Sequence, residues 1–245
     1  MMTEAILKIE HLTKRYGDKV AVNDLSLTIQ PGEIYGFIGH NGAGKTTTLK
    51  ACAGILTPDA GEILIDGVSV LTSPFEAKKR MAYLPDNPEP YSFLTGAQYL
   101  HFIADVYGIG DDVRAKRMKE LGEQFQLTEA LGQPIGTYSH GMKQRLSLMS
   151  AWIHQPRLIM MDEPFVGLDP QATHLVKEMM AAHCAGGGAI FFSTHVLDVA
   201  EKLCHKIAII RGGVLLRAGT TQEVKGDASL ESAFLDLTQE EEKPC

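Results

Sequence analysis

Apolar and polar residues alternate along the first part of the chain, in ILKIEHL and again in LSLTI, within residues 6–29. A period of two predicts strands with one buried face, and Tyr16-Gly17-Asp18 supplies a turn between them. EILIDG, residues 62–67, follows turn residues 58–61 and predicts a further strand that can pair with the first two. The pattern therefore predicts an N-terminal antiparallel β subdomain.

The pattern changes after MAYL, residues 81–84, which we expect to form a short strand. The three prolines of the next segment, PDNPEPY, exclude helix and interior sheet, so we expect a loop. Three segments then repeat apolar residues every three or four positions: GAQYLHFIADVYG, DDVRAKRMKELGEQF and GMKQRLSLMSAWIHQ. Residues 88–155 are therefore predicted to be a mostly helical insert.

Short apolar runs typical of buried strands occur in IYGFIG (34–39), RLIMMD (157–162), AIFFS (189–193) and KIAII (206–210). Helical patterns, QATHLVKEMMAAHC and LDVAEKLC, separate the last three. Alternating strands and helices predict an α/β fold with a mainly parallel sheet, which binds ligands at the carboxyl ends of its strands. In the tail, residues 220–245, LESAFLDL predicts an amphipathic helix and QEEEK a solvated acidic end.

Composition narrows the class of protein. The 245 residues carry a formal net charge of −7, with 44% hydrophobic residues and no run of lysine and arginine. This charge offers no electrostatic surface to nucleic acid, and no apolar run approaches the roughly 18 residues needed to span a bilayer. Charged residues also interrupt residues 1–20, so no secretory signal is expected. If the protein works at a membrane, another chain must cross it.

The cysteines are Cys52, Cys184, Cys204 and Cys245, and they show no CxxC pairing. Their spacing fits a reducing cytosol, where we expect free thiols. A zinc site at His183-Cys184 and Cys204-His205 is an alternative, but the spacing is not that of metal ligands.

GHNGAGKTT matches the phosphate-loop pattern of Gly, four residues and Gly-Lys-Thr. It lies between a predicted strand and a predicted helix, so its glycines let backbone N–H groups approach phosphate at the positive end of a new helix. We assign Lys45 to the β- and γ-phosphates and the Thr46 hydroxyl to Mg²⁺. The residues assigned to the nucleotide are Gly39, Asn41, Gly42, Ala43, Gly44, Lys45, Thr46 and Thr47. The alternative is a glycine-rich turn with a chance lysine.

Asp162 and Glu163 stand where the apolar strand LIMM ends. Neighbouring side chains of a strand turn to different sides, so Asp162 can face the metal held by Thr46 while Glu163 faces an attacking water. The hypothesis is that Lys45 stabilises charge and Glu163 orients or deprotonates the water. The alternative is two solvated acids at a strand end.

Four further residues are candidates for contact with the nucleotide. Ser139, with Gly141 in the first turn of a predicted helix, forms either a second anion site or a plain helix cap, and local chemistry favours neither. His195 follows another strand and could hydrogen-bond the γ-phosphate or the water. Tyr16 could stack on a base, or pack on its own sheet instead.

Together these motifs resemble the ATP-binding subunit of an ABC transporter, over residues Ile6 to Gly219. GHNGAGKTT is similar to the family's Walker A, LIMMDEP to Walker B, YSHGMKQ to the signature, VGLDP to the D-loop and STH to the switch-histidine loop. Tyr16 matches the A-loop aromatic that stacks on adenine. The resemblance implies a P-loop NTPase core, a single ABC ATPase domain over residues 1–219 with the helical subdomain at about 88–155, and an ATPase that uses ATP and Mg²⁺.

The resemblance also implies a head-to-tail homodimer with two ATP molecules between Walker A of one subunit and the signature of the other. Ser139 and Gly141 would then serve the partner's nucleotide, and Asp169 would link the two sites. Three departures from the family pattern stand out. His40 replaces a frequent proline with little expected effect, His140 and Met142 replace signature glycine and glutamine, and Asp86 takes the place of the Q-loop glutamine. The shorter Asp86 side chain is expected to reach Mg²⁺ through water.

YLPDNPEPY, YSHGMKQRL and DEPFVGLDP look most like bacterial exporter ATPases of the Ecs type, whose permease is a separate chain. This implies a cytoplasmic protein on the inner face of the plasma membrane, with coupling helices of the permease near Asp86 and the helical insert. An alternative is a soluble ABC-type ATPase acting on ribosomes or DNA, but the tandem cassettes and basic insertions of that class are missing. A regulatory nucleotide-binding module with little turnover is a third possibility.

Overall fold

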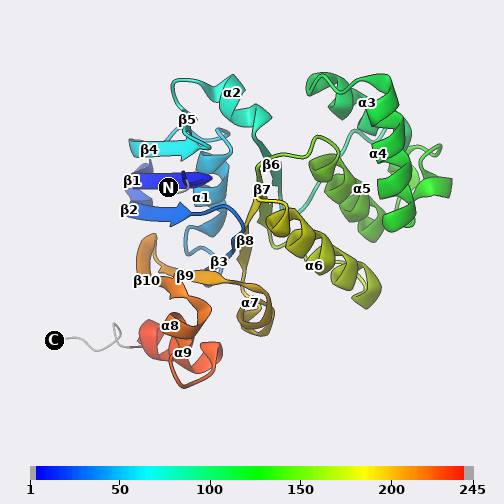
Figure 1. Ribbon diagram of the computed structural model, residues 1–245. Coiled ribbons are helices and arrows are strands. Elements are labelled where there is room, and N and C mark those ends of the chain that lie inside the picture. Colours follow the sequence, from blue (N-terminus) through cyan, green and yellow to red (C-terminus); the bar gives the residue numbers. More distant parts are fainter. Residues whose placement is uncertain (1–3, 240–245) are drawn as a thin grey trace.

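The computed structural model describes residues 4–239, which fold around two sheets (Figure 1). The smaller sheet is antiparallel, in the order β2-β1-β4-β5. Its strands are β1 (Leu7–Tyr16), β2 (Lys19–Ile29), β4 (Ala60–Ile65) and β5 (Val68–Ser69). β1 pairs with both β2 and β4, so the predicted antiparallel N-terminal strands are confirmed.

The larger sheet has the order β10-β9-β3-β8-β7-β6. Its strands are β3 (Ile34–Ile38), β6 (Met81–Leu84), β7 (Leu158–Asp162), β8 (Ala189–Thr194), β9 (Lys206–Arg211) and β10 (Val214–Thr220). All neighbours are parallel except the β9–β10 pair. Every residue of β3, β7 and β8 is buried, as expected for parallel strands covered on both faces.

The helices are α1 (Lys45–Cys52), α2 (Pro74–Lys79), α3 (Gly96–Val106), α4 (Asp111–Gln124), α5 (His140–Trp152), α6 (Pro170–Ala185), α7 (Leu197–Leu203), α8 (Thr221–Lys225) and α9 (Leu230–Gln239), with 3-10 turns η1 (Thr128–Ala130) and η2 (Ile135–Thr137). Figure 1 shows α3, α4 and α5 gathered on the side of the molecule away from the antiparallel sheet. α8 and α9 lie beside the β9–β10 edge.

Two apolar cores cover the two faces of the parallel sheet. Phe191 packs with Tyr35 and Phe37 in the core shared with α1 and the antiparallel sheet. The next residue, Phe192, faces the other core, which includes the apolar sides of α3, α4, α5 and α6. Because consecutive strand residues point to opposite faces, AIFFS supplies one phenylalanine to each core.

Four elements escaped the sequence prediction: β5, α2, β10 and α8. β5, α2 and α8 each have six residues or fewer, too few for a clear periodic pattern. β10 forms a hairpin with β9 through Gly212 and Gly213, both with positive φ, and as an edge strand it has mostly exposed or partly exposed side chains. The predicted tail helix is α9, whereas most of the acidic run falls outside residues 4–239.

The thiols of Cys52, Cys184 and Cys204 are buried and free, as predicted, and Cys245 lies outside the described residues. Burial raises the pKa of the Cys184 thiol to about 12. Cys184 donates a hydrogen bond to the Glu33 carbonyl (3.4 Å), and the Ile34 N–H donates one to His205 Nδ1 (2.9 Å). These residues of the zinc alternative therefore have backbone partners instead of a shared centre.

We expect Phe191→Ala to lower the free energy of unfolding by about 3–5 kcal/mol, because it leaves a cavity between Tyr35 and Phe37. The matched control is Phe75→Ala on α2, where the side chain is 67% exposed and the expected loss is within about 0.5 kcal/mol. Urea titration followed by circular dichroism measures both. Equal losses for the two variants would contradict this view of the core.

Candidate functional site

The phosphate loop occupies residues 39–44, between the end of β3 and the start of α1. Gly42 and Gly44 have φ values of 80° and 111°, which side chains strongly disfavour. A Cβ on Gly39 would lie 2.4 Å from the Ile210 carbonyl oxygen. The glycines are therefore required by backbone conformation and by close packing against β9.

Lys45, the first residue of α1, carries a buried ammonium group within the loop. Its side chain is 6% exposed, and Nζ donates to the carbonyl oxygens of Gly39 (2.6 Å) and His40 (3.3 Å). Glu163 Oε1 lies 3.8 Å from the same nitrogen. Burial lowers the pKa of Lys45, although the Glu163 and Asp162 carboxylates act in the opposite direction.

Asp162, the last residue of β7, joins two elements of the site. One carboxylate oxygen accepts a hydrogen bond from the Thr46 hydroxyl at 2.6 Å, and the other accepts one from the Ser193 hydroxyl. The sequence analysis missed Ser193, although a polar residue at the end of the apolar run AIFF was a usable signal. Ser193 is fully buried, so its hydrogen bond fixes the orientation of the carboxylate.

The Thr46 and Asp162 oxygens lie side by side and fit Mg²⁺, which takes one or two protein ligands and completes its shell with phosphate and water. Over residues 4–239, no group of three His, Cys, Asp or Glu side chains is close enough to hold a metal alone.

Glu163 follows the last residue of β7 and lines the same cavity as Asp162. It has a φ of 50°, and its backbone N–H donates to the carbonyl and hydroxyl oxygens of Ser193 at 3.2 Å each. His195 Nδ1 lies 2.9 Å from Glu163 Oε1. The side chains of Glu163 and His195 are 15% and 54% exposed, so this pair can meet a ligand at the open side of the site.

A cavity of about 260 Å³ opens over these groups. Its lining includes Tyr16, Lys19, Ala21, His40, Asn41, Gly42, Gly44, Lys45, Thr46, Thr47, Asp86, Asp162 and Glu163. Tyr16 is 49% exposed, and Lys14 Nζ of the same strand lies 5.7 Å from the centroid of its ring. Asp86 follows β6 and accepts a hydrogen bond from the Asn87 N–H at 2.9 Å. One cavity thus brings together residues from positions 16 to 163.

Comparison with known proteins shows the family of this chain. The family model described as ABC transporter matches residues 22–166. The chain belongs to this family. It is 33% identical to the ABC-type transporter ATP-binding protein EcsA of Bacillus subtilis (strain 168) over 242 residues, covering 97% of this chain and 98% of that protein.

Two other relatives agree. The chain is 38% identical over 220 residues to the Nod factor export ATP-binding protein I of Burkholderia pseudomallei (strain 1710b), covering 89% of this chain and 72% of that protein. A solved structure of an ATP binding subunit of an ABC transporter matches with a TM-score of 0.92 and 33% identity, covering 95% of this chain and 99% of that one. The predicted P-loop fold and ATPase activity are confirmed at the level of the family.

The remaining motif residues of this ABC ATPase lie outside the cavity lining. Ser139 caps α5, accepting a hydrogen bond from the Met142 N–H at 3.3 Å. The Asp169 carboxylate caps α6 by accepting a hydrogen bond from the Ala172 N–H at 2.8 Å, and it forms an ion pair with the Arg145 guanidinium. The Ala172 N–H and the Arg145 guanidinium hold the pKa of Asp169 below its usual range. The single chain therefore keeps its signature and D-loop apart from its own phosphate loop.

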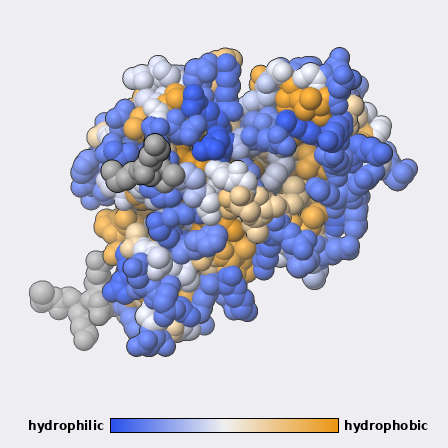
Figure 2. All heavy atoms as spheres, in the orientation of Figure 1, coloured by the Kyte–Doolittle hydropathy of each residue, from blue (hydrophilic) through white to orange (hydrophobic). Residues whose placement is uncertain are grey.

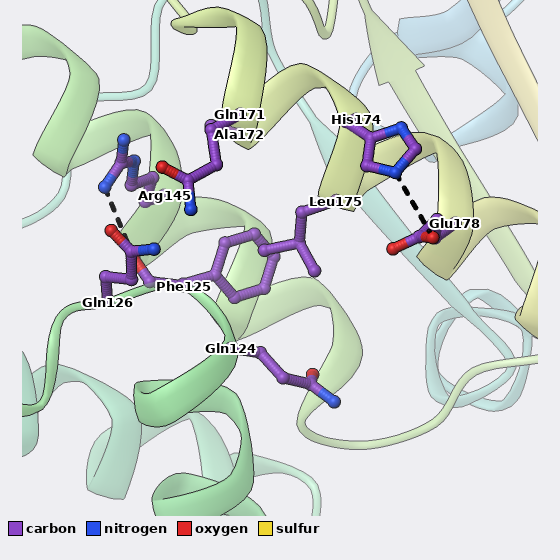
Figure 3. Close-up of a pocket in the computed structure, with 9 residues that line it drawn as sticks. All are labelled: Gln124, Phe125, Gln126, Arg145, Gln171, Ala172, His174, Leu175 and Glu178. Atoms are coloured by element: carbon purple, nitrogen blue, oxygen red, sulfur yellow. Dashed lines mark hydrogen bonds and ion pairs between the residues drawn. The ribbon is translucent and has the colours of Figure 1, made fainter.

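A second cavity, of about 200 Å³, lies where the end of α4 meets α5 and α6 (Figure 3). It is lined by Gln124, Phe125, Gln126, Arg145, Gln171, Ala172, His174, Leu175 and Glu178. Figure 3 shows Arg145 reaching the Phe125 carbonyl and His174 paired with Glu178. None of these residues belongs to the phosphate loop, so we assign the nucleotide to the first cavity.

We expect Gly39→Ala to weaken ATP binding at least about tenfold, because the added methyl group would collide with the Ile210 carbonyl and displace the loop. Gly110→Ala is the matched control, since Gly110 has a φ of −64° and no heavy atom lies within 4 Å of the added carbon. Isothermal titration with ATP and Mg²⁺ measures the two affinities. Wild-type affinity in Gly39→Ala would contradict the assigned role of this loop.

Proposed function

We propose that this ATPase drives export through a separate membrane permease, with catalysis by the cluster of Lys45, Thr46, Asp162, Glu163 and His195. The observation that carries the proposal is that Lys45, Thr46, Asp162 and Glu163 line one cavity, where the Thr46 hydroxyl bonds Asp162 at 2.6 Å. His195 lies outside that lining and is joined to it through Glu163, at 2.9 Å. Positioning and charge stabilisation are what phosphoryl transfer requires of a protein.

Each residue has a role that follows from its contacts. Lys45, held by loop carbonyls, places its positive charge at the β- and γ-phosphates. Thr46 and Asp162 would hold Mg²⁺, which neutralises phosphate charge when bound. Glu163 orients or deprotonates the attacking water, and His195, which hydrogen-bonds Glu163, would contact the γ-phosphate or that water.

The full site is proposed to need a second copy of the chain, arranged head to tail. Ser139 and Gly141 lie at the N-terminus of the 13-residue helix α5, which presents backbone N–H groups and partial positive charge suited to a γ-phosphate. A Cβ on Gly141 would lie 3.4 Å from the Gly167 carbonyl, so the signature adjoins the loop that leads to Asp169. In the dimer, Ser139 and Gly141 would serve the partner's ATP and Asp169 would link the sites.

The permease is proposed to dock at the start of the helical insert. A groove of about 330 Å³ there is lined by Tyr83, Pro85, Pro88, Tyr91, Phe102 and neighbouring residues. Tyr91 lies against Phe93 and Phe102, with ring centroids 5.8 and 6.1 Å apart, and Phe93 is 78% exposed. Figure 2 shows apolar surface over α3. An apolar surface rimmed by polar residues fits a coupling helix of a membrane protein.

Asp86 connects the proposed docking groove with the nucleotide cavity. Its neighbour Pro85 lines the groove, whereas Asp86 itself lines the cavity. A coupling helix that moves this loop would therefore move a carboxylate near the metal, through a bridging water as expected for its short side chain. Within residues 4–239, no helix has both the length and the apolar character to cross a bilayer. Docking on a permease would place this protein at the inner face of the plasma membrane.

The direction of transport is proposed from similarity. EcsA and the Nod factor export protein are the relatives named above, and the second carries export in its name. The alignment with EcsA spans 97% of this chain, so the similarity includes the groove, the helical insert and the tail.

We expect Glu163→Gln to bind ATP with near wild-type affinity while hydrolysis falls about 10²- to 10⁴-fold, because the amide is a poor base for water. The ATP-bound variant should also accumulate as a dimer on a sizing column. Glu120→Gln on the exposed side of α4 is the matched control and should keep full turnover. Unchanged hydrolysis in Glu163→Gln would remove this residue from its role.

We expect Phe93→Asp to abolish co-purification of a membrane protein while ATP hydrolysis by the isolated subunit stays within twofold of wild type. The charge would lie beside Tyr91 of the docking groove, and Phe93 does not line the nucleotide cavity. Phe75→Asp, which alters another exposed phenylalanine, is the matched control and should retain the membrane partner. Recovery of RNA in place of a membrane protein would contradict transport and support the ribosome-associated alternative.

A further inference from the structure

The C-terminal helix α9 reaches back to the phosphate loop. The ring of Phe234, on α9, packs edge-on against the ring of His40, with centroids 4.9 Å apart and an interplanar angle of 63°. Phe234 is 5% exposed and belongs to the apolar core that includes α3 to α6, so its contact with His40 is made by a buried side chain. His40 itself lines the nucleotide cavity. A segment some 190 residues along the chain therefore touches the loop that surrounds Lys45.

The backbone of His40 is part of the structure that holds Lys45. The His40 carbonyl oxygen accepts hydrogen bonds from Lys45 Nζ (3.3 Å) and from the Ala43 N–H (3.1 Å). A rotation of the His40 peptide would lengthen both bonds at once. The His40 backbone carbonyl thereby couples the position of the His40 side chain to that of the Lys45 ammonium group.

α9 is anchored firmly enough to act on that residue. At its start, the Leu230 N–H donates to Glu201 Oε2 at 2.9 Å, and Glu201 Oε1 pairs with Lys225 at 2.8 Å. Near its end, Arg211 of β9 donates to the Thr238 carbonyl. Glu201 belongs to α7, the helix that begins two residues after His195. α9 is thus fixed to the segment behind the switch histidine at one end and to the parallel sheet at the other.

We propose that α9 is a positioning element of the phosphate loop, acting through the contact of Phe234 with His40 to hold Lys45 at the β- and γ-phosphates. The aromatic edge-to-face contact restricts His40, and the His40 carbonyl then restricts Lys45. Loss of the contact would weaken triphosphate binding without altering the groups that act on water. This inference rests on the role of Lys45 proposed above.

The test compares His40→Ala, Phe234→Ala and the double variant in the full-length chain. We expect each single variant to raise KM and Kd for ATP about three- to tenfold, with kcat at saturating ATP within twofold of wild type. The Kd of the double variant for ATP should be no higher than that of the single variant with the larger defect, because the two substitutions remove the same contact. His40→Phe, which keeps an aromatic ring against Phe234, should restore most of the affinity. Additive effects of the two changes would overturn the proposal.

Controls separate this mechanism from simple damage. Leu235→Ala changes the neighbouring α9 residue, which is 44% exposed, and should leave Kd unchanged. His40 is exposed, so His40→Ala tests the contact even if Phe234→Ala loosens the helix. Binding of AMP, which lacks the phosphates that Lys45 would meet, should be the same in wild type and His40→Ala. An equal loss of AMP and ATP affinity would overturn the proposal.

The same assay distinguishes failure of the proposal from failure of the underlying function. Lys45→Ala should abolish the preference for ATP over AMP. If Lys45→Ala keeps that preference, the assigned role of Lys45 is wrong. If Lys45→Ala loses it but His40→Ala binds ATP like wild type, the phosphate site is correct and only the role of α9 is wrong.

Discussion

The buried positive charge of Lys45 is the constraint on which the site depends. An ammonium group removed from water is costly unless it has partners, and here the partners are two loop carbonyls and the nearby Glu163 carboxylate. The carbonyls of Gly39 and His40 can converge on one nitrogen only when the loop has its tight glycine conformation. The conformation of the loop and the start of α1 are therefore determined together.

The parallel sheet supplies the geometry that this charge requires. β3, β8 and β7 are neighbours, so the phosphate loop, Ser193 and the Asp162-Glu163 pair all emerge at one edge. Asp162 pairs in register with Ser193, which puts the hydroxyl within reach of the carboxylate. Covering both faces with apolar cores makes that edge rigid, because the strands have no freedom to slide without exposing buried side chains.

The antiparallel sheet and the helical insert lie on opposite sides of the molecule (Figure 1) and have different proposed roles. The antiparallel sheet carries Tyr16, which lines the nucleotide cavity, whereas the start of the helical insert carries exposed aromatic side chains, the proposed docking surface for a permease. Asp86 lies between them, at the end of β6. Ser139 and Asp169 cap the starts of α5 and α6. In the proposed head-to-tail dimer they would serve a second subunit. The tail helix α9 adds the contact of Phe234 with His40 of the phosphate loop.

The sequence alone determined most of this protein's local structure. The alternation of apolar residues predicted β1 and β2, and short apolar runs predicted β3, β7, β8 and β9. The three- and four-residue spacing predicted α3 to α7, and the glycines with Lys45 and Thr46 predicted a phosphate loop. These signals depend only on neighbours along the chain. Tertiary structure decided which distant groups meet. The bond of Ser193 to Asp162 and the contact of Phe234 with His40 depend on strand order and on the path of the tail, which no local pattern records.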